Sequence, residues 1–274
     1  MILLAADTPQ ISLVAQPVFQ IGSFNVTNSM LLGLVGTVLC FAILLHTRRR
    51  AITKRHTRLS IAVLWLFEWL LDQATEVLGN RRLAAQVAPL AIAMFFFIII
   101  NNWLEILPIV GPLSLNGHQL FRGLAADLNF TLSLAIITLV ASQLWAIKQR
   151  GLFGSLGRYF ANPFKDPLHA FEGILEFIAE LSRTLALALR LFGNIFGGEV
   201  LILVMIFLAS WATPVVLPVF MGLELFVGAV QAYIFFMLTV TFISLGSSPR
   251  ATAHPTEAAA ATEPAKLTMV TGGA

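Results

Sequence analysis

Charged residues and cysteine are both scarce in this sequence of 274 residues. Only 11% of the residues are charged, whereas 58% are hydrophobic and the mean hydropathy is +0.85. Average soluble domains have about 25% charged residues, so this composition excludes an ordinary soluble domain and indicates a polytopic membrane protein. The one cysteine, Cys40, excludes an intrachain disulfide and a metal cage built from cysteines.

Long apolar runs are abundant, and five of them reach the roughly 20 residues that a bilayer crossing takes. They lie near residues 29–46, 86–107, 124–147, 172–209 and 214–246. The last two are too long for one perpendicular crossing, so we expect them to be steeply tilted or to lie partly along the membrane plane. The sequence therefore predicts an all-α polytopic membrane protein whose last two helices form a long, tilted antiparallel hairpin.

Basic residues are concentrated in loops on one side of the predicted spans. Three stretches hold 12 of the 17 Lys and Arg residues, namely 48–58, 81–82 and 148–165. The segments on the opposite side contain only Arg122. Because loops rich in Lys and Arg stay cytoplasmic, the N-terminus is expected outside and the C-terminus in the cytoplasm. Orientation and anionic lipid explain the basic pI, and no nucleic-acid-binding motif accompanies these loops.

This pattern divides the chain into an external segment 1–27, a membrane domain 28–246 and a tail 247–274. The tail is rich in Ala, Thr, Pro and Gly with balanced charge, and such a composition cannot build a core. We therefore expect the tail to be disordered.

One stretch of the membrane domain, residues 60–82, is predicted to be an amphipathic helix on the cytoplasmic surface. Glu68, Asp72 and Glu76 recur every four residues, opposite a mostly apolar face. This acidic face is either a solvated helix surface or a docking face for a partner subunit.

An arginine stands inside the otherwise lipid-like stretch RLFGNIFGGE, residues 190–199. Ionisable residues are costly in lipid and usually face a bundle interior, a water-filled cavity or a partner. At about 100° per residue, one helix face collects His169, Glu172, Glu176, Glu180, Arg183, Arg190 and Asn194. Glu199 lies about 140° from this stripe and about 13 Å beyond Arg190 along the axis. Arg190 thus lies between two separate acidic regions.

The next apolar run completes this arrangement if residues 167–209 and 214–246 form an antiparallel hairpin that turns near residues 212–214. The expected partners at equal depth are then Glu199 with Glu224, Asn194 with Gly228, and Arg190 with Gln231, within about 3 Å.

A fixed positive charge between two carboxylate regions suits one kind of chemistry. Arginine does not lose its proton in proteins, so Arg190 cannot be a relay and is a barrier instead. Protons that move along glutamates and water from either side would stop there, while a carboxylate on a moving partner would be attracted and released. The pattern predicts two half-channels that meet a rotor.

The residues that carry this chemistry also carry a resemblance. LALRLFGNIFGGE followed by ELFVGAVQAYIFFMLTVTFISL, together with FFFIIINNWLEILP, FRGLAADLNFTLSLA and NVTNSMLLG, is similar to subunit a of the F-type ATP synthase over roughly residues 20–246. The resemblance implies a non-catalytic stator subunit without a cofactor or metal of its own. It would lie beside a ring of c subunits, with the peripheral-stalk subunit b and the remainder of the ATP synthase as further partners.

The resemblance also implies roles for individual residues. Arg190 would be the essential arginine that faces the ring carboxylate, with Asn194 and Gln231 as its polar neighbours. Glu199 and Glu224 match the paired uptake positions, where many members have one Glu and one His. Two glutamates here suggest a carboxyl pair that shares a proton.

The remaining candidates lie on the two sides of this centre. Glu176 matches an acidic position that lines the cytoplasmic exit, and Glu172 and Glu180 are either its helpers or helix-surface charges. Asp127 and Asn129 would line the uptake vestibule, although a carboxylate at a helix N-terminus is equally natural there.

Two other functions fit parts of the pattern. A secondary transporter or ion channel would use an intramembrane Arg/Glu site to bind an anion or a coupling ion, but such proteins often show repeated halves, and the sequence has no internal repeat. A structural anchor would neutralise Arg183 and Arg190 with Glu176 and Glu180. The basic loop and the surface helix favour a bacterial inner membrane over a plastid or mitochondrial one.

Overall fold

The computed structural model describes residues 17–21, 24–55, 57–107, 114–115, 118–119, 121–151 and 167–247. Its helices are α1 (Asn28–Ile52), α2 (Arg58–Leu78), α3 (Arg81–Glu105), α4 (Leu128–Arg150), α6 (Pro167–Ala209) and α7 (Thr213–Ser247). Short 3-10 turns η1 (Leu124–Ala126) and η2 (Ser210–Ala212) and the strands β1 (Pro17–Ile21), β2 (Phe24–Thr27), β3 (Ser114–Leu115) and β4 (His118–Gln119) complete it. The predicted disordered tail, residues 247–274, lies outside the described residues except for Ser247, which is the last residue of α7.

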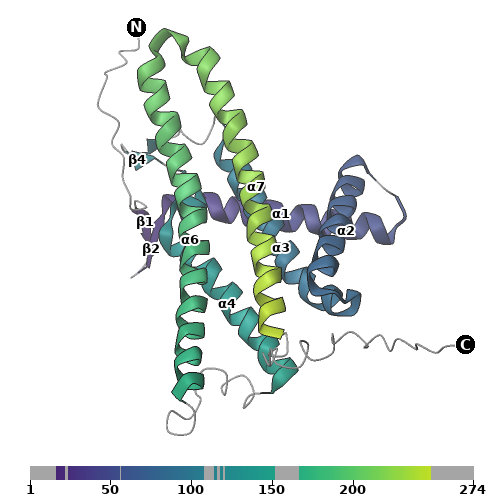
Figure 1. Ribbon diagram of the computed structural model, residues 1–274. Coiled ribbons are helices and arrows are strands. Elements are labelled where there is room, and N and C mark those ends of the chain that lie inside the picture. Colours follow the sequence, from purple (N-terminus) through teal and green to yellow (C-terminus); the bar gives the residue numbers. More distant parts are fainter. Residues whose placement is uncertain are drawn as a thin grey trace, which may run out of the picture.

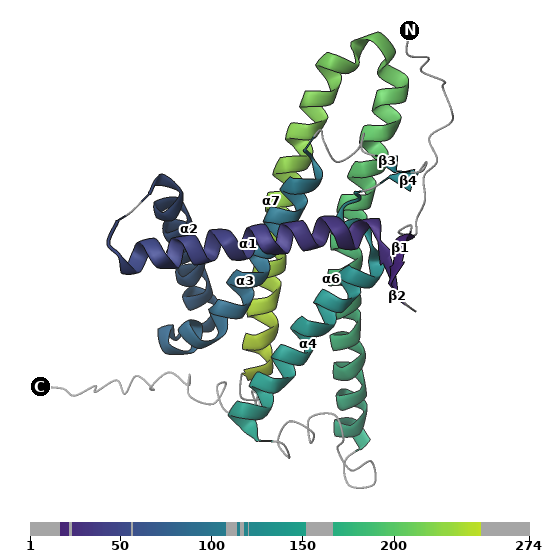
Figure 2. The same cartoon turned by 180° about the vertical axis from the view of Figure 1, so that it is seen from behind.

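The all-α prediction is confirmed. Five of the described helices are long and apolar enough to cross a membrane, and α2 is not among them. The two antiparallel hairpins, β1 with β2 and β3 with β4, are short and lie at the end of the molecule where α1 begins (Figure 2).

Helix ends are set by local capping chemistry. The Thr57 hydroxyl and the Ser60 side chain form a capping box at the start of α2. Gly79 closes α2 with φ 65°, a left-handed conformation that favours glycine. The Asn80 side chain then accepts from the Arg82 amide at 2.9 Å and starts α3. The surface helix therefore ends before the predicted residue 82, and the basic pair that was assigned to its end belongs to α3.

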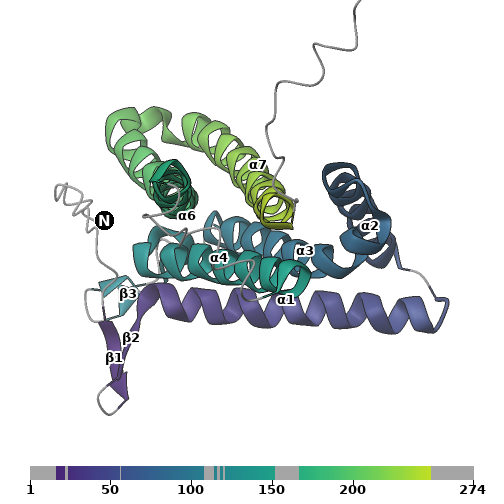
Figure 3. The ribbon, with the colours of Figure 1, turned by 60° about the horizontal axis from the view of Figure 1, so that its bottom comes forward.

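The helices pack in layers. Figure 3 shows α1 beneath α3 and α4, with the α6–α7 hairpin on the opposite side of those two helices and α2 beside the far end of α3. The core lies between α3, α4 and α7, where Ile92, Phe235 and Phe236 are fully buried.

The hairpin is too long to stand upright in a bilayer. At about 1.5 Å per residue, the 43 residues of α6 span about 65 Å and the 35 residues of α7 about 52 Å. The hydrocarbon core is about 30 Å thick. Moreover, α1 runs across the hairpin in Figures 1 and 2, so these helices cannot all follow the membrane normal. The predicted long, tilted hairpin is confirmed.

Helix α3 fixes both of its neighbours through amide and indole groups near its end. Asn102 donates to the Gly228 carbonyl of α7 at 3.4 Å, and Trp103 donates to the Leu225 carbonyl at 3.2 Å. On the other side, the side-chain oxygen of buried Asn101 lies against Gly36 of α1, where a Cβ would overlap it. These contacts hold α1, α3 and α7 at a fixed depth relative to one another.

We expect Gly36→Ala to lower the free energy of unfolding by about 1–3 kcal/mol, because the methyl group would overlap the Asn101 amide and a tightly packed interior resists added volume. The measurement is the thermal midpoint of the chain purified in its native membrane assembly. Adding Asn101→Ala should recover most of the loss. Val38→Ala, at a side chain of α1 that is 62% exposed, is the control. An unchanged midpoint for Gly36→Ala would contradict the close α1–α3 packing.

Candidate functional site

The two helices of the hairpin approach each other where the sequence places its polar residues. Asn194 of α6 donates its side-chain amide to the Gln231 oxygen of α7 at 2.7 Å. Gly198 lies against the Glu224 carboxylate so closely that a Cβ would overlap it. Glycine at this position thus makes room for a carboxylate between the helices.

One of the three expected pairs is supported by an interaction, since Glu199 and Glu224 are close enough to interact electrostatically. The Gln231 oxygen accepts from Asn194, one turn along α6 from Arg190, and the equal depth of Arg190 and Gln231 stays a prediction. The Gly228 carbonyl is bonded by Asn102 of α3, so α7 is also tied to α3 at this level, and the equal depth of Gly228 and Asn194 stays a prediction.

A buried ion pair joins the loop before α4 to α6. The Arg122 Nε lies 3.3 Å from the Glu199 Oε2, and the two side chains are 5% and 31% exposed. The guanidinium also lies over the Phe196 ring, 5.8 Å from its centroid. Arg122 is therefore fixed from two sides by α6.

A third carboxylate completes this acidic cluster, which consists of Glu105, Glu199 and Glu224 together with Arg122. Glu105 ends α3 and interacts electrostatically with the other three members. Its carboxylate lies against Gly123, where a Cβ would overlap it. The Arg122 guanidinium thus interacts with two of the three carboxylates, those of Glu105 and Glu199, while Glu224 interacts with these two carboxylates alone.

Sequence reasoning missed both Glu105 and Arg122 as members of the site. Arg122 had a signal, because it is the one basic residue in the loops opposite the basic side. Glu105 stands inside the apolar stretch FFFIIINNWLEILP, where an ionisable residue is itself a sign of function.

A cavity of about 150 Å³ opens between α6 and α7 next to this cluster. It is lined by Asn194, Gly197, Gly198, Leu201, Ile202, Phe220, Leu223, Glu224 and Val227. The cavity therefore reaches from a member of the acidic cluster to Asn194, four residues from Arg190. Its size is sufficient for several water molecules, each of which takes about 30 Å³ in the liquid.

The polar stripe of α6 is a real surface feature, because α6 is one continuous helix. Arg190 and Asn194 are exposed, as is Glu172, whereas Glu176 and Glu180 are half-buried. The side chain of His169 lies outside the described residues.

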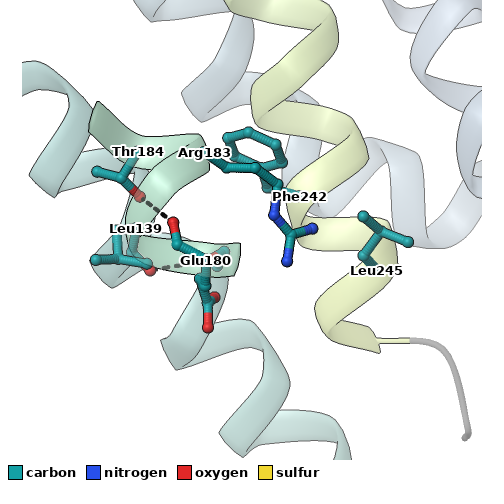
Figure 4. A pocket seen from close by; sticks show the side chains of 7 residues that line it. Leu139, Glu180, Arg183, Thr184, Phe242 and Leu245 are labelled. Carbon is teal, nitrogen blue, oxygen red and sulfur yellow. Dashed lines mark hydrogen bonds between the residues drawn. The ribbon is translucent and has the colours of Figure 1, made fainter. Parts of the chain in front are cut away.

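A second polar site lies toward the other end of α6, between α4, α6 and α7 (Figure 4). Gln143 of α4 donates to the Glu180 carboxylate at 2.5 Å. Arg183 bonds the Ala179 carbonyl and places its guanidinium 5.8 Å from the Phe242 ring centroid. Figure 4 shows Arg183 directed toward α7, while Glu180 is directed away from it. Both side chains line this pocket, and whether they neutralise each other along the stripe stays a prediction.

Asp127 is the N-cap residue of α4. Its carboxylate caps the helix by accepting from the Asn129 amide at 3.0 Å, and it also accepts from the Ser29 hydroxyl at 3.2 Å. The helix N-terminal alternative thus describes Asp127, and a role of Asp127 and Asn129 in lining a channel stays a prediction.

Comparison with known proteins places these residues in a family. The family model described as ATP synthase A chain matches residues 29–244, which covers every helix described here. The chain belongs to this family. It is therefore a multi-pass membrane subunit of an ATP synthase.

Individual proteins that are similar to this chain belong to the same family. The chain is 29% identical over 222 residues to ATP synthase subunit a of Acidothermus cellulolyticus, covering 81% of this chain and 77% of the relative. It is 35% identical over 184 residues to that of Mycobacterium bovis, covering 63% and 67%. It is 30% identical over 237 residues to that of Psychrobacter arcticus, covering 78% and 80%.

We expect Arg122→Leu to destabilise the assembled subunit by about 1–3 kcal/mol, because removal of the buried guanidinium leaves the half-buried Glu199 carboxylate without its partner beside two other carboxylates. Thermal unfolding of the purified ATP synthase measures this. The double change with Glu199→Gln should recover part of the loss.

The matched control is the exposed pair of Arg81 and Asp72, whose side chains are 75% and 63% exposed at a separation of 3.9 Å. Arg81→Leu should change the stability by about 1 kcal/mol or less, as is typical of surface pairs. Equal effects of the two leucine variants would show that the Arg122 pair is not buried in the assembly.

Proposed function

We propose that this subunit carries protons between two offset half-channels and presents Arg190 to a rotating ring of c subunits, so that proton flow turns the ring. The observation that supports this most directly is the exposed Arg190 between two carboxylate sites on α6. Glu199 lies about 13 Å beyond it and Glu180 about 15 Å before it along the helix axis. ATP chemistry would then reside in other subunits.

The uptake half-channel would consist of the acidic cluster and the adjoining cavity. Three carboxylates lie close together there with one guanidinium, which interacts with Glu105 and Glu199, and burying unpaired negative charge in lipid is far more costly than binding protons. The cluster can therefore hold exchangeable protons. From Glu224, the cavity lined by Asn194 leads toward the exposed face of α6.

Arg190 would separate the two paths. A guanidinium keeps its charge, so it stops proton hopping and attracts an ionised carboxylate on the ring. At 4 Å and an effective dielectric constant of 20, such a pair contributes about 4 kcal/mol. Asn194, which Gln231 holds in place, would be its polar neighbour on the side of the acidic cluster.

The release half-channel would follow the polar stripe in the opposite direction. Glu176 and Glu180 are half-buried on the same face of α6 as Arg190, and Glu172 is exposed one turn further. Glu180 is held by Gln143, so its carboxylate has a fixed position. Glu176 would be the main acceptor, with Glu172 and Glu180 as helpers.

The basic loops orient the proposed subunit. Arg48, Lys54 and Arg58 near the junction of α1 and α2 are exposed, and such loops stay cytoplasmic. The N-terminus would then be outside and the C-terminus cytoplasmic, in a bacterial inner membrane. Subunit b of the peripheral stalk would hold the subunit against rotation.

We expect Arg190→Gln to reduce ATP-driven proton pumping by at least about tenfold, which corresponds to about 1.4 kcal/mol of barrier, because the ring carboxylate loses its charged partner. Arg190→Lys should also be poor, since lysine lacks the planar fork and sheds its proton when desolvated. Acidification of vesicles that contain the assembled enzyme measures both variants.

Arg183→Gln is the control for this prediction. Arg183 lies two turns away on the same stripe, but its guanidinium is directed to Phe242 and the Ala179 carbonyl. It should keep most of the pumping. If Arg190→Gln pumped as well as Arg183→Gln at equal assembly, then Arg190 would not be the barrier, and the half-channel proposal would fail.

The acidic cluster makes a separate prediction. Glu224→His should keep part of the pumping, because histidine titrates near the working pH. Glu199→His should reduce pumping more, because its imidazole would lie beside the Arg122 guanidinium, which disfavours a second positive charge.

Replacing both Glu199 and Glu224 by leucine should stop pumping, whereas the control Glu68→Gln on α2 should not affect it. Survival of pumping in the double leucine variant would remove these residues from the uptake path.

A further inference from the structure

The surface helix α2 contacts α7 directly beside the translocation residues. The rings of Trp69 and Tyr233 stack with centroids 5.4 Å apart and planes at 29°. The Tyr233 hydroxyl donates to the Gln73 side-chain oxygen at 3.3 Å. Behind these contacts, Leu70 and Ala74 of α2 are completely buried. A helix that the sequence assigns to the membrane surface thus reaches the middle of the hairpin.

Tyr233 and Gln231 point to opposite sides of α7. They are two residues apart, which corresponds to about 200° around a helix. Gln231 is 1% exposed and accepts from Asn194 of α6, while Tyr233 contacts α2. At this level, α7 is held between α2 on one side and the polar centre on the other.

For the contact between Gln231 and Asn194, the rotation of α7 about its axis is more important than its position along that axis. Asn102 and Trp103 of α3 bond carbonyls of α7 at Gly228 and Leu225, and these bonds fix its position along the axis. A side-chain amide lies about 6 Å from the helix axis, so a rotation of about 20° would move it by about 2 Å. That displacement is enough to break the 2.7 Å bond between Asn194 and Gln231.

We propose that α2 is a positioning element of the translocation site. Trp69 and Gln73 hold Tyr233, and Tyr233 sets the rotation of α7 that keeps the Gln231 oxygen on Asn194. This inference rests on the proposed function for its consequence, because a displaced Gln231 releases the polar neighbour of Arg190. The structural part stands independently and can be measured without proton transport.

The first experiment measures the geometry in the assembled ATP synthase. Cys40 is replaced by serine, cysteines are placed at positions 194 and 231, and a short bifunctional thiol reagent reports how readily the two positions are linked. Trp69→Ala and Gln73→Leu should slow this linking by about threefold or more, in line with the loss of an aromatic pair or a hydrogen bond. Trp65→Ala, one turn earlier on α2 and 66% exposed, should leave the linking rate unchanged.

A second cysteine pair, at positions 103 and 225, separates rotation from general loosening. Its linking rate should stay the same in the Trp69 and Gln73 variants, because the Asn102 bond to the Gly228 carbonyl, which this pair leaves intact, still holds α7 against α3 there. Unchanged linking of positions 194 and 231 would overturn the proposal, and so would an equal change in both pairs.

Proton pumping is then measured with Asn194 and Gln231 intact. Trp69→Ala should lower pumping by about threefold or more at equal assembly, whereas Trp69→Phe, which keeps a stacking ring, should restore most of it. If Trp69→Ala prevents assembly, Tyr233→Phe replaces it, since this change removes only the bond to Gln73. If the Trp69 and Gln73 variants change the linking of positions 194 and 231 but Arg190→Gln pumps normally, the proposed function fails and the positioning role of α2 stands. If these variants leave the linking unchanged but Arg190→Gln has a pumping defect, the positioning role fails and the proposed function stands.

Discussion

In the hydrocarbon of a bilayer, a polar group without a partner costs several kcal/mol, and this constraint shapes the whole chain. Hydroxyl groups inside the spans bond the carbonyl one turn earlier, as Thr37 does to Gly33, Thr138 to Leu134 and Thr239 to Phe235. Against this background of satisfied groups, two buried atoms stand out among the described residues, the Asn101 Oδ1 and the Gln231 Nε2. The second belongs to Gln231, whose side-chain oxygen accepts from Asn194 in the proposed translocation site.

The distribution of charge follows from the same constraint. The exposed pair of Arg81 and Asp72 lies in water and contributes little. The pair of Arg122 and Glu199 is buried, and it is retained beside two more carboxylates that have no cation of their own among the described residues. Replacing such a cluster by apolar residues would often stabilise a protein. This cost fits the proposed role of the cluster in proton binding better than a role in stability.

Much of the fold could be predicted from the sequence, because hydropathy and helix geometry are local properties. The five spans and the stripe of α6 depend on composition and on the helical repeat, and Glu199 meets Glu224 because both lie the same distance from the turn. The contributions of Glu105 and Arg122 could not be predicted, since the end of α3 and the loop before α4 meet α6 only through tertiary packing. The boundary at residue 82 was missed because the turn chemistry of Gly79 and Asn80 outweighs the amphipathic pattern. The bond between Asn194 and Gln231 could not be predicted from equal depth alone, because two long side chains can meet across a difference in height.

The two helices of the hairpin differ in how much of their surface is buried. In the most apolar 18-residue stretch of each helix, 44% of the residues of α7 are buried inside the chain, compared with 11% of α6. Helix α7 is anchored by α2, α3 and α4, so a side chain on it, such as Gln231, has a fixed position. Helix α6 instead leaves one long face uncovered, and Arg190 stands on that face. In the proposed function, a charge that meets a moving partner needs exposure, whereas the groups that orient its neighbours need a rigid support. The rigid support extends through Tyr233 to α2, which links a helix at the edge of the molecule to the polar centre of the hairpin.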